Sequence, residues 1–426
     1  MIDLDWLRTR RWFGGKGAAI AGVRVLNEAR VSDALACVTI EVSYEGGRAA
    51  ERYLVPVRPG ERSEDKRYIE TLDEDALRTV FDLIRGGRTV ETSASTLRGE
   101  RFAPDLLDAL PAKPSVRRLS AEQSNTSVVF GEQLIVKLIR KLEHGRNPEL
   151  EIGAQLARAG FRATPRLAGA LSVSGAVEAT LAVAHRFVRV EADGWSHVLA
   201  ALRSRAPSLL AEVEELGTRV GELHTALAAG DDPAFAPEPI TQADHERWTH
   251  DLLRELDATV QAAAGAVPEL AARVPSLRAR IERLRALRPA GVKIRQHGDL
   301  HLGQVLRSEG QWLIFDFEGE PARTLAERRA KHCPYKDAAG MLRSFAYAGA
   351  AAGDDSLIAS CRDAFLRGYR AAATPLLPGD GRVLLESLEL EKLLYELRYE
   401  VGHRPDWVRI PARDLLSMDA EGGYVK

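Results

Sequence analysis

The chain has 426 residues, of which 45% are hydrophobic and 28% are charged, a composition typical of a globular protein with two or three domains. Its 59 basic and 61 acidic residues nearly cancel, which argues against a global field that attracts nucleic acid or an anionic membrane. The three cysteines are widely spaced and no stretch approaches 18 apolar residues, so we expect a cytoplasmic protein without a disulfide framework or a membrane span.

The first 90 residues are predicted to form a small β-rich module. Residues 20–57 contain strand-like runs separated by the glycine-rich turn EGGR, which indicates an antiparallel sheet. The stretch EDALRTVFDLIRGG has helical periodicity and ends in paired glycines, so it predicts a helix that closes the module.

A second strand-rich region is predicted for residues 91–190. The segment SVRRLSAEQSNTSVVFGEQLIVKLIRKL is typical of strands joined by turns, and PELEIGAQLARAG predicts a helix that begins at Pro148. Two further strands are expected at GALSV and TLAVAHRFV. From residue 191 to 426 long helical patterns dominate, so the chain as a whole is predicted to be an α+β protein.

The helix-rich region is interrupted by HGDLHLGQVLRSEGQWLIFDFEGEP, in which two β-type runs flank the turn residues SEG. This pattern predicts a hairpin with Asp299 before its first strand and Asp316 at the end of its second. Because a hairpin brings its ends together, both carboxylates should meet there, with the amide of Gln304 on the first strand. Such an oxygen-rich set suits Mg²⁺.

Enzymes that transfer phosphoryl groups combine such groups with a lysine that contacts the phosphates. Lys137, in the apolar run LIVKL, is the candidate, because a charge inside such a run needs a reason. Either Glu149 or Glu151, on the helix that follows, can pair with it. The turn SNTS offers hydroxyl, amide and backbone N–H groups to phosphates from four successive residues: Ser124, Asn125, Thr126 and Ser127.

Several motifs in this order resemble the aminoglycoside-phosphotransferase-like kinases, and within them the bacterial maltokinases. The resemblance rests on HGDLHLGQ, IFDFEGEP and DAAGMLRSFAYA, and on EQSNTSVVFGEQLIVKLIRKL with NPELE. RRWFGGKG is similar to the start of the maltokinase N-terminal cap, and YELRYEVGHRPDW to the C-terminal end of the family. The similarity therefore extends over nearly the whole chain.

This resemblance implies an ATP- and Mg²⁺-dependent kinase with a bilobal, protein-kinase-like fold and a small β-rich N-terminal cap. The cap would span residues 1–90, the nucleotide lobe 91–190 and the helical lobe 191–426. It also implies Asp299 as catalytic base, Gln304 and Asp316 as Mg²⁺ ligands, Lys137 on the ATP phosphates and Glu151 as the partner of Lys137.

The acceptor implied by the resemblance is maltose, phosphorylated to maltose 1-phosphate for glucan synthesis. The segment HCPYKDAAGM differs from the Pro-Leu-Arg-Asp type of run expected in a maltokinase, so a glucosamine kinase is the nearest alternative. An aminoglycoside-inactivating enzyme and a non-catalytic nucleotide- or sugar-binding pseudokinase are the more distant ones.

The acceptor pocket is predicted from aromatic and polar residues near these motifs. Trp407 is favoured because GHRPDW places an aromatic ring beside hydrogen-bonding groups, and Asp337 and Arg343 either line the pocket or form an ion pair. The full set of candidate acceptor contacts is His297, Asp337, Arg343, Tyr395, Arg404 and Trp407.

The two histidines of HGDLH have the i, i+4 spacing of a helical zinc site. The preceding strand-like run and the absence of HExxH argue against zinc. We interpret His297 as a residue that holds Asp299 in place and His301 as one that shapes the same loop. Trp12 and Phe13 of RRWFGGKG are expected to be a buried anchor.

Overall fold

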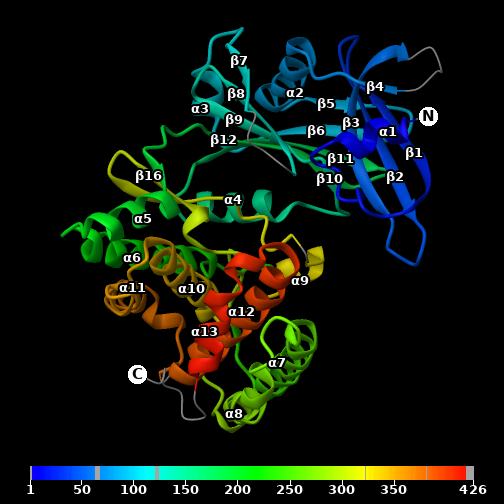
Figure 1. Cartoon of the computed structure of the whole chain (residues 1–426). Coiled ribbons are helices and arrows are strands. Elements are labelled where there is room, and N and C mark those ends of the chain that lie inside the picture. Colours follow the sequence, from blue (N-terminus) through cyan, green and yellow to red (C-terminus); the bar gives the residue numbers. More distant parts are fainter. Residues whose placement is uncertain (1, 63–67, 120–123, 322, 380, 419–426) are drawn as a thin grey trace. The chain divides into compact units, whose positions relative to one another are not determined.

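The computed structural model describes residues 2–62, 68–119, 124–321, 323–379 and 381–418. The chain separates into two compact units (Figure 1). The first consists of Met1–Arg158 and Pro165–Arg189, and the second of Ala159–Thr164 and Val190–Lys426. Within the described ranges, no helix is both long enough and apolar enough to cross a membrane.

The first unit begins with an antiparallel sheet in the order β1-β2-β3-β10, in which β4 also pairs with β3. The strands are β1 (Ile20–Arg30), β2 (Ala36–Tyr44), β3 (Glu51–Arg62), β4 (Tyr68–Glu70) and β10 (Lys141–Leu142). Trp12 and Phe13, after helix α1 (Leu4–Thr9), are buried against Tyr53 of β3. The predicted sheet and the predicted aromatic anchor are both confirmed.

A second sheet of this unit carries the strand with Lys137. Its order is β5-β6-β11-β12-β9-β8-β7. The strands are β5 (Thr89–Glu91), β6 (Ser95–Arg101), β7 (Val116–Arg118), β8 (Thr126–Phe130), β9 (Leu134–Leu138), β11 (Leu167–Gly175) and β12 (Ala179–Arg186). Helices α3 (Pro104–Asp108) and α4 (Pro148–Arg158) accompany it, and α4 begins at Pro148 as predicted.

Residues of the predicted cap and of the predicted nucleotide lobe share one hydrophobic core. Helix α2 (Glu74–Gly86) is capped by Asp73, which accepts a hydrogen bond from the N–H of Ala76, and ends at Gly87 in the left-handed conformation. Its apolar face packs onto the second sheet, where Phe81 stacks on Phe130 of β8 with 4.6 Å between ring centroids. The division of the chain at residue 90 stays a prediction, because both sides of it lie in one compact unit.

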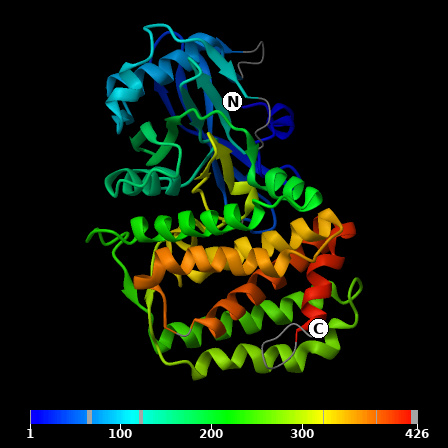
Figure 2. The same ribbon diagram turned by 90° about the vertical axis from the view of Figure 1, so that its left-hand side faces the viewer.

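The second unit is mainly helical, as the periodicity predicts, and its long helices lie in stacked rows (Figure 2). The helices are α5 (Gly194–Ser204), α6 (Leu209–Leu227), α7 (Gln242–Ala263), α8 (Leu270–Glu282), α9 (Leu325–Arg329), α10 (Tyr335–Ala352), α11 (Ile358–Ala373), α12 (Arg382–His403) and α13 (Arg409–Ser417). Short 3-10 turns occur at η1 (Arg283–Ala286), η2 (Leu302–Gln304), η3 (Thr374–Leu376) and η4 (Pro405–Trp407).

The predicted hairpin is present in the second unit. Strands β16 (Val305–Ser308) and β17 (Gln311–Ile314) pair antiparallel, with Val305 opposite Ile314, and β13 (Ala192–Asp193) joins the outer edge of β16. A second small sheet pairs β14 (Glu238–Pro239) with β15 (Val292–Lys293), directly before the HGDLH loop. Gln304 lies in η2 rather than on the first strand as predicted, because the chain makes a 3-10 turn before it extends.

Helix α10 approaches the HGDLH loop closely at Gly340. A Cβ atom at this position would lie 2.5 Å from the carbonyl oxygen of Leu300, closer than real Cβ contacts. Only a glycine at position 340 therefore allows helix α10 to pack directly against the backbone of the loop.

Candidate active site

Asp337 anchors the loop that carries Asp299. Its Oδ2 accepts hydrogen bonds from the backbone N–H of His297 (2.8 Å) and from His224 Nε2 (3.0 Å), and its Oδ1 accepts one from the N–H of Gly298 (2.9 Å). The side chain is 2% exposed. Burial alone would raise the pKa of Asp337, but the hydrogen bond from His224 and the nearby donors outweigh it, so that the pKa is lowered.

His297 links this anchor to both Asp299 and the hairpin. Its Nε2 donates to the carbonyl oxygen of Phe315 (2.9 Å), and its Nδ1 faces the backbone N–H of Asp299 (3.4 Å). A carbonyl only accepts and an amide only donates, so this pattern fits the neutral ring with the proton on Nε2. The contacts are those of a positioning residue, and the expectation that His297 holds Asp299 in place agrees with them.

His301 shapes the same loop two residues further on. Its Nδ1 accepts a hydrogen bond from the N–H of Gly303 (2.9 Å), and burial lowers the pKa of the ring. The following backbone also turns back, because the N–H of Gln304 donates to the carbonyl oxygen of His301 (2.9 Å). This turn delivers the amide of Gln304 to the end of the hairpin.

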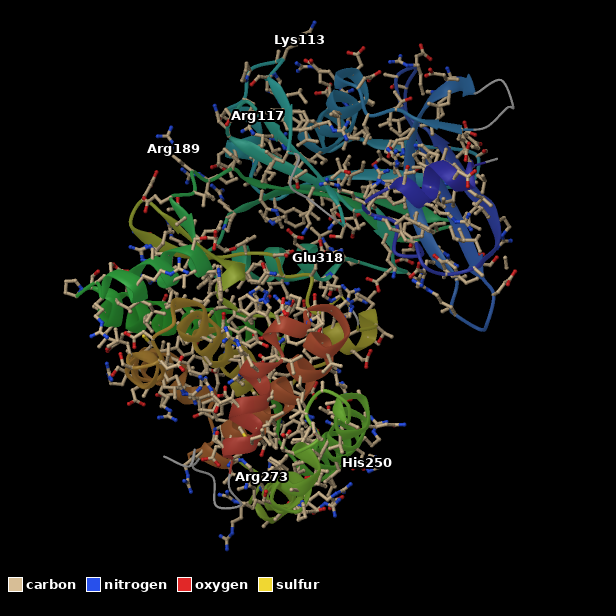
Figure 3. The ribbon with its side chains drawn as sticks, in the orientation of Figure 1. Lys113, Arg117, Arg189, His250, Arg273 and Glu318 are labelled. Carbon is tan, nitrogen blue, oxygen red and sulfur yellow. The ribbon has the colours of Figure 1, made fainter. Side chains whose placement is uncertain are left out.

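Gln304 and Asp316 meet at that end. The amide Nε2 of Gln304 lies 3.2 Å from Asp316 Oδ2, and the N–H of Phe315 donates to the carbonyl oxygen of Gln304 (3.2 Å). Asp316 has a φ of +65°, a left-handed conformation that is costly for most side chains and that clusters at functional sites. Glu318, labelled in Figure 3, follows on the same loop, and its carbonyl oxygen accepts a hydrogen bond from Arg328 (2.8 Å).

The donor set at this end of the hairpin fits Mg²⁺. The side chains of Gln304 and Asp316 both carry oxygen atoms, the ligand type that a hard cation such as Mg²⁺ prefers. The chemistry of the two residues therefore suits Mg²⁺, and their role as its ligands stays a prediction.

A cavity of about 290 Å³ opens beside Asp299 within the second unit. Helix α12 supplies one wall through Leu388, Lys392 and Tyr395, and α10 supplies Lys336 and Gly340. Its charged lining consists of six carboxylates and four cations: Glu255, Asp299, Glu320, Glu327, Asp337 and Glu391, with Arg323, Lys336, Lys392 and Arg398. The lining is thus acidic on balance.

A neighbouring cavity of about 320 Å³ shares part of this lining and continues between α7 and α12. Trp248 stacks on His332 there, with ring centroids 4.4 Å apart, and burial lowers the pKa of His332 to about 3. At neutral pH this imidazole is therefore uncharged. On the shared wall, burial acts to raise the pKa of Glu391, but Lys336 at 2.8 Å and the other cationic groups nearby, Arg323 among them, together outweigh it, and the pKa falls to about 2.

Of the predicted acceptor contacts, Tyr395 lines the cavity beside Asp299. Asp337 also borders it, but its carboxylate is occupied by the loop contacts described above. His297, likewise, contacts the loop and the hairpin. We therefore reassign Asp337 and His297 from substrate contacts to positioning residues, because their polar atoms already have protein partners.

Arg343 does not serve as predicted. It is 1% exposed, its Nε lies 3.0 Å from Glu396 and its Nη1 lies 2.6 Å from Asp414. Because a buried guanidinium held by two carboxylates belongs to the helical core, the prediction that Arg343 contacts the acceptor is corrected.

Arg404 and Trp407 form a cluster near the end of α12. Arg404 pairs with Glu400, and its guanidinium lies 5.4 Å from the centroid of Trp407, whose ring stacks on Tyr347 at 6.0 Å. Tyr347 is ten residues beyond Asp337 on α10, which corresponds to about 15 Å along a helix. Their role as acceptor contacts stays a prediction.

In the first unit, Lys137 of β9 pairs with Glu149 of α4, with 2.9 Å between Nζ and Oε2. Glu149 is 5% exposed, and its other oxygen lies 3.6 Å from His185 of β12. The assignment of Glu151 as the lysine partner is therefore corrected to Glu149. Positions two apart on a helix point to nearly opposite sides, and α4 presents residue 149 to the sheet.

The predicted phosphate-binding turn is shorter than expected, because β8 begins at Thr126. Ser127 lies opposite Lys137 in the β8–β9 register, and Asn125 Oδ1 accepts a hydrogen bond from the N–H of Arg140 (3.3 Å). Residues 120–123, which precede Ser124, lie outside the described part. Contacts of Ser124, Asn125, Thr126 and Ser127 with phosphates stay a prediction.

Two residues at these sites lie outside every motif named above: His224 and Lys392. Lys392 of α12 lies 3.4 Å from Asp299 Oδ1, across 93 residues of chain. His224 reaches Asp337 across 113 residues. Both sit in ordinary amphipathic helices, whereas Glu149 lies in the motif NPELE.

Comparison with known proteins agrees with this architecture. Residues 115–320 match the Phosphotransferase enzyme family, and residues 6–82 match the Maltokinase N-terminal cap domain. A glucosamine kinase of Streptacidiphilus jiangxiensis is 30% identical over 385 residues, which cover 81% of this chain and 86% of that protein. One of Mycolicibacterium smegmatis (strain ATCC 700084 / mc(2)155) is 30% identical over 367 residues, covering 76% and 89%.

Solved structures of glucosamine kinases are similar over almost the entire chain. One crystal form superposes with a TM-score of 0.74 at 26% identity and 94% coverage of both chains. Another, in complex with glucosamine, ADP and inorganic phosphate, gives 0.73 at 25% identity, covering 96% of this chain and 97% of the other. The chain belongs to the phosphotransferase enzyme family, as a sugar kinase with the aminoglycoside-phosphotransferase-like fold and a maltokinase-type N-terminal cap.

Proposed function

We propose that this protein transfers the γ-phosphoryl group of ATP to a hydroxyl group of an aminosugar, with glucosamine as the first substrate to test. The observation that carries this proposal is the hairpin that joins Gln304 to Asp316, next to a loop that holds Asp299 beside a cavity. We place the reaction in the cytoplasm, as the cysteine pattern predicts.

In the proposed reaction, Asp299 accepts the proton of the acceptor hydroxyl. The hydroxyl oxygen forms a bond to the γ-phosphorus, the bond from that phosphorus to the bridging oxygen breaks, and ADP leaves with the electron pair. Gln304 and Asp316 would hold Mg²⁺, which would neutralise phosphate charge. Lys137, kept in place by Glu149, contacts the phosphates of ATP.

Residues 124–127 add hydroxyl and N–H groups to the phosphates in this proposal. We further propose that residues 1–90 act as a cap, that 91–190 bind the nucleotide and that 191–426 bind the acceptor and carry the base.

The acidic lining beside Asp299 favours an aminosugar over a neutral sugar. An ammonium group is attracted to a pocket with more carboxylates than cations, and the attraction is stronger where water is partly excluded. The same acceptor is named for relatives that are 30% identical over most of their length.

Maltose, converted to maltose 1-phosphate for glucan synthesis, is the second candidate acceptor. It is favoured by the match of residues 6–82 to the Maltokinase N-terminal cap domain. The neighbouring cavity, with the Trp248–His332 stack, offers apolar ring surface to a second sugar ring.

The test is ADP release with glucosamine, maltose, glucose and kanamycin, followed by NMR of the product to identify the phosphorylated hydroxyl. We expect the highest kcat/KM with glucosamine. Turnover of maltose alone would replace the first candidate by the second, and turnover of kanamycin alone would indicate an aminoglycoside-inactivating enzyme. If the protein binds nucleotide but releases no ADP in the presence of any of these sugars, it is a non-catalytic module.

Asp299→Asn tests the assignment of the base. Because asparagine cannot accept the proton, we expect kcat to fall by about 10²–10⁴-fold while the affinity for ATP changes little. The measurement is steady-state kinetics together with calorimetric titration of the nucleotide. A variant that keeps near-normal turnover would remove Asp299 from the mechanism.

A further inference from the structure

Lys392 makes a contact with the proposed base that no sequence motif announces. Its Nζ lies 3.4 Å from Asp299 Oδ1, and the two side chains are 28% and 23% exposed. An ion pair that is only partly open to water is screened less than one on the surface. This pair also lines the cavity proposed for the acceptor.

The surroundings of Lys392 fix both its position and its charge. Its ammonium lies 5.0 Å from the centroid of the Tyr395 ring, one turn further along α12. Burial alone would lower the pKa of Lys392, but Asp299, then Glu396 on the same helix and Glu320 from the loop after β17, raise it. Lys392 therefore stays protonated and provides a fixed positive charge beside Asp299, the proposed proton acceptor.

Glu396, which acts electrostatically on this lysine, is held in the helical core. It receives a hydrogen bond from Arg343 Nε (3.0 Å), and Arg343 in turn contacts Asp414 of α13 (2.6 Å). Acidic and basic side chains alternate in the order Asp299, Lys392, Glu396, Arg343, Asp414. Burial raises the pKa of Glu396, while Arg343 and Lys392 act in the opposite direction. This order restrains Lys392 and Arg343, because rotating either side chain moves its cation away from carboxyl groups on both sides.

The contact with Lys392 also gives the two carboxylate oxygens of Asp299 different roles. Oδ1 faces the ammonium of Lys392, which leaves Oδ2 to accept a proton. The backbone N–H of the same residue is turned toward His297 Nδ1. Loop and helix together thus restrict the torsion angles that decide where Oδ2 points.

We propose that Lys392 is a positioning residue for the base: its ammonium holds Oδ1 of Asp299 so that Oδ2 is aimed at the acceptor hydroxyl. The inference rests on the proposed function, in which Asp299 accepts the proton. The bond changes are those of that reaction, and Lys392 neither gains nor loses a proton in it.

The test compares Lys392→Met, which keeps the length but removes the charge, with Lys392→Arg, which keeps the charge. Arg382→Met is the matched control, because it removes a cation from an exposed position at the start of the same helix. Each variant is assayed for kcat, for KM of ATP and of sugar, and for the pH dependence of kcat/KM.

For Lys392→Met we expect kcat to fall by about 10- to 100-fold, a part of what a general base contributes, while KM for ATP changes less than about twofold. The acid side of the kcat/KM profile should move to higher pH by about one pH unit, because the carboxylate has lost its counter-charge. Lys392→Arg should recover most of kcat, and Arg382→Met should match the unaltered enzyme.

A double variant separates positioning from a purely structural role. If Lys392 acts through Asp299, adding Lys392→Met to Asp299→Asn should cost almost nothing further, because the group that it positions is already gone. An equal loss in both backgrounds would overturn the proposal. So would a Lys392→Met enzyme with unchanged kcat and pH profile.

The same comparisons are made for slow ATP hydrolysis without sugar, in which water takes the place of the sugar hydroxyl. If the unaltered enzyme phosphorylates no sugar, the proposed function fails, while the hydrolysis rates of the variants still decide the role of Lys392. Circular dichroism checks that each variant is folded, and Lys392→Arg decides the outcome if Lys392→Met does not fold.

Discussion

The carboxylate of Asp337 offers the sharpest test of how the loop that carries Asp299 is held. Asp337→Asn keeps the size of the side chain but replaces one carboxylate oxygen by an NH₂ group. The native oxygens accept from three donors: the N–H groups of His297 and Gly298 and Nε2 of His224. Whichever way the amide is turned, at least one of these donors then faces another donor.

The cost follows from the burial of the site. An unpaired buried N–H costs about 1–3 kcal/mol, and the remaining bonds lose the extra strength that a charged acceptor gives them. With Asp337 2% exposed, water cannot replace the lost partner. We therefore expect Asp337→Asn to lower the free energy of unfolding by about 2–4 kcal/mol, and to lower kcat because His297 and Asp299 lose their anchor.

The assay is urea unfolding followed by tryptophan fluorescence, beside kcat measured under the same conditions. Asp363→Asn, at an exposed position of α11, is the matched control and should change neither quantity. Unaltered stability together with unaltered kcat in Asp337→Asn would refute the reasoning.

The pH dependence of this variant has a definite sign. The pKa of Asp337 is lowered in the folded protein, so the unfolded chain binds its proton more readily as the pH falls. The stabilisation is fully present above the ordinary carboxyl pKa of about 3.9 and is lost below it. Asp337→Asn lacks this term, so its stability should fall less steeply in acid than that of the unaltered protein.

Two more substitutions test the lysine partner and the support of the loop. Glu149→Gln should raise KM for ATP by about tenfold, because Lys137 loses a buried charged partner worth about 1.5 kcal/mol or more. Glu151→Gln should change KM for ATP little. If steady-state kinetics gave the opposite order, Glu151 would again be the assigned partner of Lys137. Gly340→Ala should lower kcat by about 10- to 100-fold, because the added Cβ would push the loop away at Leu300. KM for ATP should stay unchanged. A variant with the turnover of the unaltered enzyme would show that helix α10 moves instead of the loop.

The parts of the site that could be predicted are those set by short-range pattern. The strand–turn–strand sequence around SEG is enough to bring Gln304 and Asp316 together, since a hairpin leaves little freedom in how its ends meet. The aromatic anchor at Trp12 and Phe13 is likewise a local property of large apolar side chains.

The parts that could not be predicted depend on helix phase or on contacts between distant segments. Glu149 and Glu151 are both on α4, and only the rotation of that helix against β9 decides which one meets Lys137. Lys392 contacts Asp299 across 93 residues and His224 contacts Asp337 across 113, and nothing in the sequence of an amphipathic helix indicates such a contact. The prediction that Arg343 contacts the acceptor was wrong because its carboxylate partners, Glu396 and Asp414, lie on two other helices.

The pairing of β10 with β3 affects whether the N-terminal cap of this protein can be replaced by the cap of a related kinase. A two-residue strand from the segment after β9 completes the N-terminal sheet, and Phe81 of α2 is stacked on Phe130 of β8. A chimera that received a cap from another kinase would have to receive these facing positions as well, or else leave the apolar side of β8 uncovered. The cap and the strands beneath it are therefore expected to be inherited together and to vary together, although they meet at a point where the sequence suggests two modules.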